Sequence, residues 1–148
     1  MVKKTMRIMM LFCAVTFTGT GLAEGDAYKD IHAVLNDYTQ GTYLGDRALL
    51  ESVFHPSAVM NGYLGKQLMI SKPAQFIADV VKMEIHKAKT PYSYQVTSIS
   101  IDGKVASVVL TEAGFPGNMA FTNYFHLIDD GHGWKIISKT FIGKADAS

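Results

Sequence analysis

Cysteine is almost missing from this sequence. The one cysteine, Cys13, lies in an N-terminal segment that we expect to be removed, and the bulky Phe12 before it argues against lipid attachment. Without thiols, the rest of the chain has neither a disulfide framework nor a thiolate metal site available. It must fold on its core alone.

A strong charge of one sign is missing as well. The chain has 14 Lys and Arg against 13 Asp and Glu, a formal net charge of +1. Removal of residues 1–23 takes away Lys3, Lys4 and Arg7 but no acidic residue, so the net charge becomes −2. Nucleic acids and anionic membranes attract strongly basic surfaces, and we therefore expect no nucleic-acid partner.

Several catalytic and metal-binding motifs are also lacking. The sequence has no His-Glu-x-x-His, no pair of acids beside a histidine at metal-ligand spacing, no glycine-rich phosphate loop after a strand and no Gly-x-Ser-x-Gly. These motifs carry zinc sites, nucleotide sites and serine hydrolase nucleophiles. We expect no metal site, no cofactor and no serine hydrolase chemistry.

The first 23 residues have the parts of a secretory signal peptide. Basic residues up to Arg7 precede an apolar run over 8–17, and the small residues Gly21 and Ala23 precede the expected cleavage site. The apolar run is shorter than the roughly 20 residues that span a bilayer. The prediction is cleavage after Ala23, with no membrane span left and a single domain over 24–148 that is periplasmic or secreted.

The first half of that domain has helical periodicity. Apolar residues recur at three- and four-residue steps over 27–42, and Gly45 and Asp46 are placed to end one helix and cap the next, which Pro56 stops. Strands are expected at 57–63 and 66–70. Ser71 is then placed to cap a third helix, with Pro73 in its first turn.

The second half has the alternation and turns of β-strands. Asp102-Gly103 predicts a hairpin between 92–101 and 104–112, and a second hairpin is expected between 121–128 and 133–142. Residues 113–118 are expected to form a longer connection. Helices followed by antiparallel strands are typical of an α+β domain.

Five segments in this order carry a family resemblance: YTQGTYLGD (38–46), LESVFHPSA (50–58), ISIDGKVA (99–106), FTNYFHL (121–127) and GWKIISKTF (133–141). Together they resemble the nuclear transport factor 2-like superfamily, in the branch described as "putative lumazine-binding". The resemblance implies a cone, in which three N-terminal helices wrap against a strongly curved, mostly antiparallel sheet with a pocket at its wide end. Relatives include ketosteroid isomerase, polyketide cyclase-like proteins and binding domains without chemistry, so the fold does not decide the function.

Tyr38 and Glu112 are candidates for that pocket. Tyr38 lies in the apolar stripe of the first helix, either as a core tyrosine with one hydrogen-bond partner or as a donor into the pocket, as the resemblance to ketosteroid isomerase implies. Glu112 follows the alternating apolar residues Ala106, Val108 and Leu110. It lies either at the pocket rim, as a usable acid or base, or in solvent.

His55 is a further candidate, in the tripeptide Phe-His-Pro. Its imidazole either satisfies backbone groups in a turn or acts as a general base. The strand at 58–63 reads AVMNGY and has no carboxylate, although a ketosteroid isomerase needs its base near there. This disfavours catalysis by that mechanism.

The last hairpin holds Asn123, His126 and Trp134. A two-residue turn at 130–131, which Asp-Gly favours, pairs His126 with Lys135, on the face away from Trp134, whereas a five-residue loop places it beside Ile136. Asn123 and Trp134 then share an apolar face. Trp134 is either a core residue or a platform on which a ligand stacks.

These residues lead to three function hypotheses. The first is an exported domain that holds a small apolar or aromatic molecule, for which eight Met, eight Phe and seven Tyr provide an adaptable lining. The second is an isomerase or dehydratase with Glu112 or His55 as base and Tyr38 as polarising donor. The third is a homodimeric accessory protein, whose outer sheet face is expected to carry Lys135, Ile137, Lys139 and Phe141. The ligand-binding candidates are Tyr38, Glu112, Asn123, His126 and Trp134.

Overall fold

A computed structural model describes residues 20–145, with side chains from Glu24 onward. The predicted signal peptide and Cys13 therefore lie outside the described residues, apart from the backbone of 20–23, which contains the expected cleavage site. Among the described residues, no helix is long and apolar enough to cross a membrane.

The chain forms three α-helices, one short 3-10 helix and six strands. In order they are α1 (Thr20–Leu44), α2 (Arg47–Val53), β1 (Phe54–Leu64), β2 (Gln67–Ser71), α3 (Pro73–Met83), η1 (Ile85–Lys87), β3 (Ser93–Asp102), β4 (Val105–Phe115), β5 (Met119–Asp129) and β6 (Trp134–Ala145).

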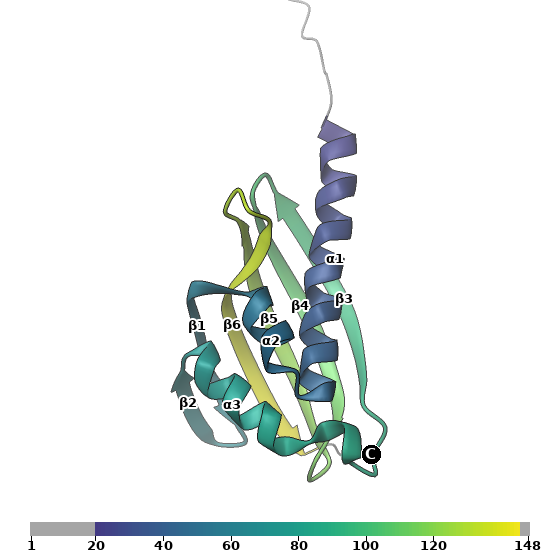
Figure 1. The fold of residues 1–148 in the computed structure, drawn as a ribbon, viewed down its shortest axis with the longest axis vertical. Helices are drawn as coiled ribbons and strands as arrows, with labels where there is room; N and C mark the ends of the chain where they lie inside the picture. Colours follow the sequence, from purple (N-terminus) through teal and green to yellow (C-terminus); the bar gives the residue numbers. More distant parts are fainter. Residues whose placement is uncertain (1–19, 146–148) are drawn as a thin grey trace, which may run out of the picture.

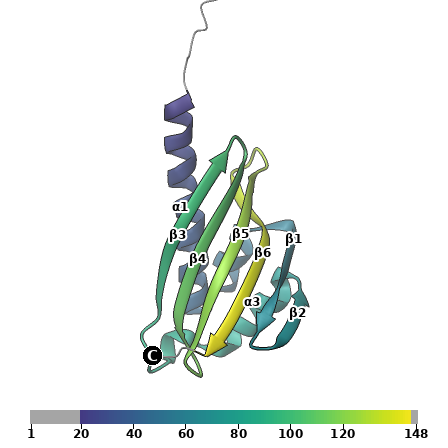
Figure 2. The ribbon, with the colours of Figure 1, turned by 180° about the vertical axis from the view of Figure 1, so that it is seen from behind.

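One six-stranded sheet, in the order β2-β1-β6-β5-β4-β3, organises the fold. All neighbours are antiparallel except β1 and β6, which are parallel. The three helices cover one face of the curved sheet (Figure 1), and the view from behind shows the other face without helices (Figure 2). The predicted α+β architecture, with helices first and a mostly antiparallel sheet, is confirmed.

The helix boundaries follow local sequence signals. Gly45 ends α1 at a φ of +68°, and the Asp46 side chain accepts a hydrogen bond of 3.0 Å from the Leu49 amide at the start of α2. The predicted cap of the third helix is wrong. Ser71 pairs with β1 as the last residue of β2, so Lys72 precedes Pro73 at the N-terminus of α3.

Strand β4 is longer than predicted. The hairpin at Asp102-Gly103 is confirmed, since Asp102 pairs with Val105. Residues 113–118 do not form a separate connection, because β4 continues to Phe115, which pairs with Met119 at the start of β5. An irregularity in the pairing after Glu112 lets the strand continue through this region.

The last hairpin differs from both predicted registers. Asp129 pairs with Trp134, and Leu127 pairs with Ile136, but His126 pairs with Ser138. Ile137 is therefore an extra residue on β6, a β-bulge. An extra residue reverses which side chains of a strand face the core.

The bulge corrects the prediction for the outer sheet face. Before it, Trp134 and Ile136 face the core, and after it Lys139 does. Lys139 is only 4% exposed and Phe141 also points to the helix-covered side, where both line a cavity. Neither belongs to the outer face on which a regular strand would have placed them.

The core fills the space between the helices and the sheet. Asn123 and Trp134 share the buried side of the last hairpin with Phe125 and Ile136, as predicted. Other fully buried side chains come from every layer: Ile31, Leu35, Tyr38, Leu50, Ile77, Val80, Ile85, Leu110 and Leu127.

Gly62 on β1 allows β1 to pack closely against β6. A Cβ at this position would overlap the backbone oxygen and the ring of Phe141. We expect Gly62→Ala to lower the free energy of unfolding by roughly 1–3 kcal/mol, the usual cost of overpacking. Urea unfolding measures it. Gly25→Ala is the control, since no atom lies within 4 Å of its Cβ, and equal stability of the two variants would contradict the prediction.

Candidate functional site

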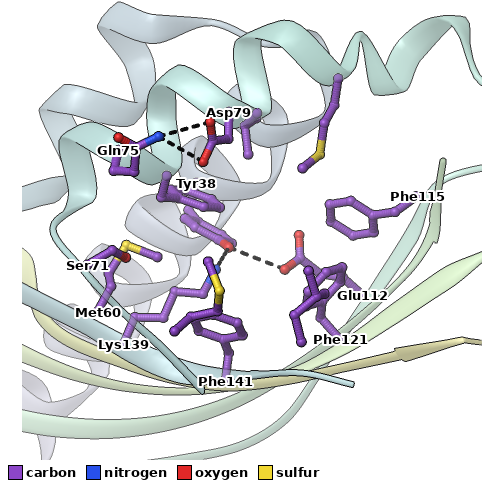
Figure 3. A pocket seen from close by; sticks show the side chains of 15 residues that line it. Tyr38, Met60, Ser71, Gln75, Asp79, Glu112, Phe115, Phe121, Lys139 and Phe141 are labelled. Carbon is purple, nitrogen blue, oxygen red and sulfur yellow. Dashed lines mark hydrogen bonds between the residues drawn. The ribbon is translucent and has the colours of Figure 1, made fainter. Parts of the chain in front are cut away.

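A cavity of about 140 Å³ lies between α3 and one end of the sheet. Side chains from α1, α3 and strands β1, β2, β4, β5 and β6 reach it (Figure 3). Its lining is mostly apolar and rich in Met and Phe: Met60, Leu64, Met69, Phe76, Val80, Met83, Phe115, Phe121 and Phe141. The polar lining residues are Tyr38, Ser71, Gln75, Asp79, Glu112 and Lys139.

Glu112 is the centre of the polar groups. It comes from β4, where the irregular pairing begins, and it is 2% exposed. Its Oε1 accepts a hydrogen bond of 2.6 Å from the Tyr92 hydroxyl, and its Oε2 accepts bonds of 2.6 Å from Asn123 Nδ2 and 3.3 Å from the Tyr38 hydroxyl. Three donors compensate for the water that this buried carboxylate has lost.

Lys139 continues this network on the other side of Tyr38. Its Nζ donates a hydrogen bond of 2.7 Å to the Tyr38 hydroxyl oxygen, whose own proton goes to Glu112. Figure 3 shows the three groups in a row at the sheet side of the cavity. Four aromatic rings surround the ammonium group, at 4.1 to 6.0 Å from Nζ to the ring centres, within the range of cation–π attraction.

Burial changes the proton affinity of these groups. Loss of water lowers the pKa of Lys139 from 10.5 to about 8, although the nearby Glu112 charge opposes the shift. Burial, and then the Glu112 charge, raise the pKa of Tyr38 and of Tyr92 far above the usual value of 10.0. Both tyrosines therefore stay protonated as donors, while Lys139 changes its charge near pH 8.

Two of the sequence candidates come together in the cavity. Tyr38 and Glu112 both line it and are hydrogen-bonded to each other. Asn123 lies behind them: its amide binds Glu112, and it is fully buried without reaching the cavity surface. Its Oδ1 has no hydrogen-bond partner among the described residues.

The other candidates lie elsewhere. Trp134 is a buried residue of the core cluster, and His126 is exposed and paired with Ser138. His55 Nδ1 accepts a 3.0 Å hydrogen bond from the Ser57 amide, which is the local turn role considered above. None of these three lines the cavity. A binding role for His126 and Trp134, and a catalytic role for His55, are predictions that the cavity does not support.

Sequence reasoning missed Lys139 and did not place Tyr92. A lysine on a strand normally faces solvent, and only the bulge at Ile137 turns this one inward. No residue type in the segment IISK marks a bulge. Tyr92 lies just before β3, so its direction depends on how the chain enters the sheet.

The low pKa of Lys139 predicts a pH-dependent stability. Because the folded-state value of about 8 is below the ordinary 10.5, the unfolded chain binds more protons between these values. The contribution of Lys139 to stability therefore rises with pH in this window. From pH 7 to about 9.5, wild type should gain roughly 2 kcal/mol in free energy of unfolding relative to Lys139→Met.

Urea unfolding at several pH values measures this difference. The Lys144→Met variant is the control, because Lys144 is on the same strand and exposed. If the difference in free energy of unfolding between wild type and Lys139→Met stays constant with pH, the lowered pKa of Lys139 is contradicted.

Comparison with known proteins supports the fold. An NTF-2 like protein of unknown function from Silicibacter pomeroyi is 21% identical, with a TM-score of 0.73 over 82% of this chain and 98% of that one. An NTF2-like protein of unknown function from Methylobacillus flagellatus is 26% identical, with a TM-score of 0.69 over 81% and 94% of the two chains. A third, from Shewanella baltica and also of unknown function, is 23% identical, with a TM-score of 0.69 over 87% and 100%.

A search of curated proteins found no similar sequence. The family described as "Putative lumazine-binding" matches residues 26–142, which include most of α1, all of α2, α3 and η1, and most of the sheet. The match covers Tyr38, Glu112 and Lys139, so the cavity network belongs to the matched region. The chain is therefore a member of this family, within the nuclear transport factor 2-like superfamily.

Proposed function

We propose that this protein binds a small apolar or aromatic molecule in the cavity described above. The proposal rests on one observation: the cavity, called the chamber below, is mostly apolar, and the hydrogen-bonded side chains of Lys139, Tyr38 and Glu112 lie together on one of its walls. Ligand sites combine these two features, because apolar walls provide affinity and a few fixed polar groups provide orientation.

The size of the chamber limits the ligand. An apolar protein cavity of about 150 Å³ takes up benzene, and this one holds about 140 Å³. One ring therefore fits inside. The lining residues Leu64 and Met83 are 41% and 44% exposed, so the chamber reaches the surface there and a second ring can extend outward. A fused heteroaromatic molecule of the kind named by the family description fits in this way.

The polar wall favours a ligand with a hydrogen-bond acceptor. An ammonium group has three N–H donors, and only one of those on Lys139 has a hydrogen-bond acceptor among the described residues. Glu112, by contrast, already accepts three hydrogen bonds. A carbonyl oxygen on the ligand is the group that this wall accommodates best.

An isomerase or dehydratase with Glu112 or His55 as base has less support. The two oxygens of Glu112 are engaged by three donors, and His55 does not reach the cavity. Tyr38 is a donor at the cavity wall, as that mechanism requires, but its proton is directed to Glu112. We therefore favour binding over proton abstraction by a carboxylate.

We also propose that the protein is exported and forms a homodimer through its outer sheet face. The signal-peptide pattern supports export to the periplasm or the medium. Tyr63 pairs directly with Leu68 and Ile142, so these side chains share a face, and Ile70 lies two residues from Leu68 on the same side. All four are exposed, Ile70 to 76%, on the face that no helix covers (Figure 2).

Ligand binding is tested by thermal unfolding against a panel of aromatic carbonyl compounds that includes lumazine. A ligand at 100 times its Kd should stabilise the fold by about 2.7 kcal/mol. Met69→Trp fills the cavity and should weaken binding at least about tenfold, since it removes the space for one ring. Leu68→Trp, the adjacent residue on the opposite face, should bind like wild type. A panel without any stabilising compound, or equal binding by both variants, would count against the proposal.

The dimer is tested by light scattering of the protein without its signal peptide. We expect the mass of two chains, and a shift to the mass of one for Ile142→Glu, because a charge in an apolar interface loses its water without gaining a partner. Tyr28→Glu, at a similarly exposed residue of α1 on the helix side of the sheet, is the control. A wild-type monomer at high concentration would exclude the dimer.

A further inference from the structure

Lys139 has a placement unlike that of the other lysines near the sheet. It is the only basic residue among the described residues that line the cavity, and its Nζ is next to the Tyr38 hydroxyl on the cavity wall. Lys135 and Lys144, on the same strand, do not reach this cavity. A ligand ring held among the phenylalanines would thus have one amine beside it.

The surroundings of this amine favour its reactive form. Only a neutral amine is a nucleophile, and desolvation in an apolar pocket is one way in which proteins activate lysine. With the pKa lowered to about 8, roughly half of Lys139 is neutral at pH 8. An ordinary lysine at that pH is neutral to well below about 1%.

A proton path leads away from the amine. Nζ is 2.7 Å from the Tyr38 oxygen, and that hydroxyl is 3.3 Å from Glu112 Oε2. If Tyr38 passes its proton to Glu112 and takes one from Lys139, the ammonium–carboxylate pair becomes an amine and a carboxylic acid. The net charge of the three groups does not change.

We propose that Lys139 is a nucleophilic lysine that captures a small aromatic aldehyde or ketone as an imine in the cavity. This inference rests on the proposed function, because the carbonyl compound must first occupy the chamber. It adds a covalent step and a substrate class to non-covalent binding.

Imine formation needs no proton donor or acceptor beyond Lys139, Tyr38 and Glu112. The neutral Nζ attacks the carbonyl carbon, and its proton moves to the carbonyl oxygen, which gives a carbinolamine. The proton that passed from Nζ through Tyr38 to Glu112 then returns by the same path to the hydroxyl group, which leaves as water, and the C–N bond becomes a protonated imine. One C=O bond is lost, one C=N bond is formed, and Glu112 is again a carboxylate.

The product suits the site that formed it. The protonated imine places its positive charge where the ammonium was, 4.1 Å from the ring centre of Phe76 and 5.4 Å from that of Phe141. Glu112 remains as the counter-charge across Tyr38. No new charge is buried, so the cavity stabilises the imine by the same contacts that hold Lys139.

The test uses benzaldehyde and sodium cyanoborohydride, which reduces an imine to a stable benzylamine. After incubation at pH 8, peptide mass spectrometry should find Lys139 benzylated at least about tenfold more than exposed Lys144, because about half of Lys139 is neutral at this pH and the cavity holds the aldehyde beside it. The yield should rise with pH to a midpoint near 8. Benzaldehyde labelled with ¹³C at the carbonyl should show an imine resonance without any reductant.

Matched variants separate the covalent step from binding. Lys139→Arg keeps the charge but forms no imine, so the labelled signal and the benzylated peptide should both vanish, whereas Lys144→Arg should keep them. Met69→Trp should lose them because it closes the chamber. Circular dichroism confirms that each variant is folded.

The outcomes distinguish this inference from the proposed function. If benzaldehyde stabilises wild type but Lys139 is modified no more than Lys144, covalent capture is overturned and binding stands. If no compound in the panel stabilises the protein and no lysine is selectively modified, both fail. Selective modification that persists in Met69→Trp would also overturn capture within the cavity.

Discussion

The rest of the structure is arranged around one buried pair of ionisable residues, Lys139 and Glu112, joined through the Tyr38 hydroxyl. Lys139 and Glu112 do not touch, because the Tyr38 hydroxyl accepts from one and donates to the other. Removing two charges from water is expensive unless every remaining group is satisfied. Tyr92 and Asn123 satisfy the carboxylate, and aromatic rings surround the ammonium.

This pair connects elements that are far apart in the sequence. Tyr38 comes from α1, Glu112 from β4 and Lys139 from β6, so the network ties the long helix to the middle of the sheet. The same groups form one wall of an otherwise apolar chamber. The groups that tie α1 to the sheet therefore also give the cavity its only basic group among the described residues, and structure and binding depend on the same contacts.

Two irregularities in the strands create the chamber. The bulge at Ile137 turns Lys139 and Phe141 inward, and the irregular pairing after Glu112 lets Phe115 reach the same cavity. A regular hairpin would place Lys139 in solvent, where its amine would be an ordinary surface charge. Bulges are common next to functional sites because they redirect one side chain without changing the strands on either side.

The sequence by itself determined the α+β class, the helix ends at Gly45 and Asp46, and the hairpin at Asp102-Gly103, because these depend on local backbone preferences and on hydrophobic periodicity. It also pointed to Tyr38 and Glu112, since each follows an apolar stripe into the core. Only the tertiary structure decided that Lys139 joins them. One extra residue in β6 exchanges the side chains that face the core with those that face solvent, and no local signal in the sequence indicates where this bulge occurs.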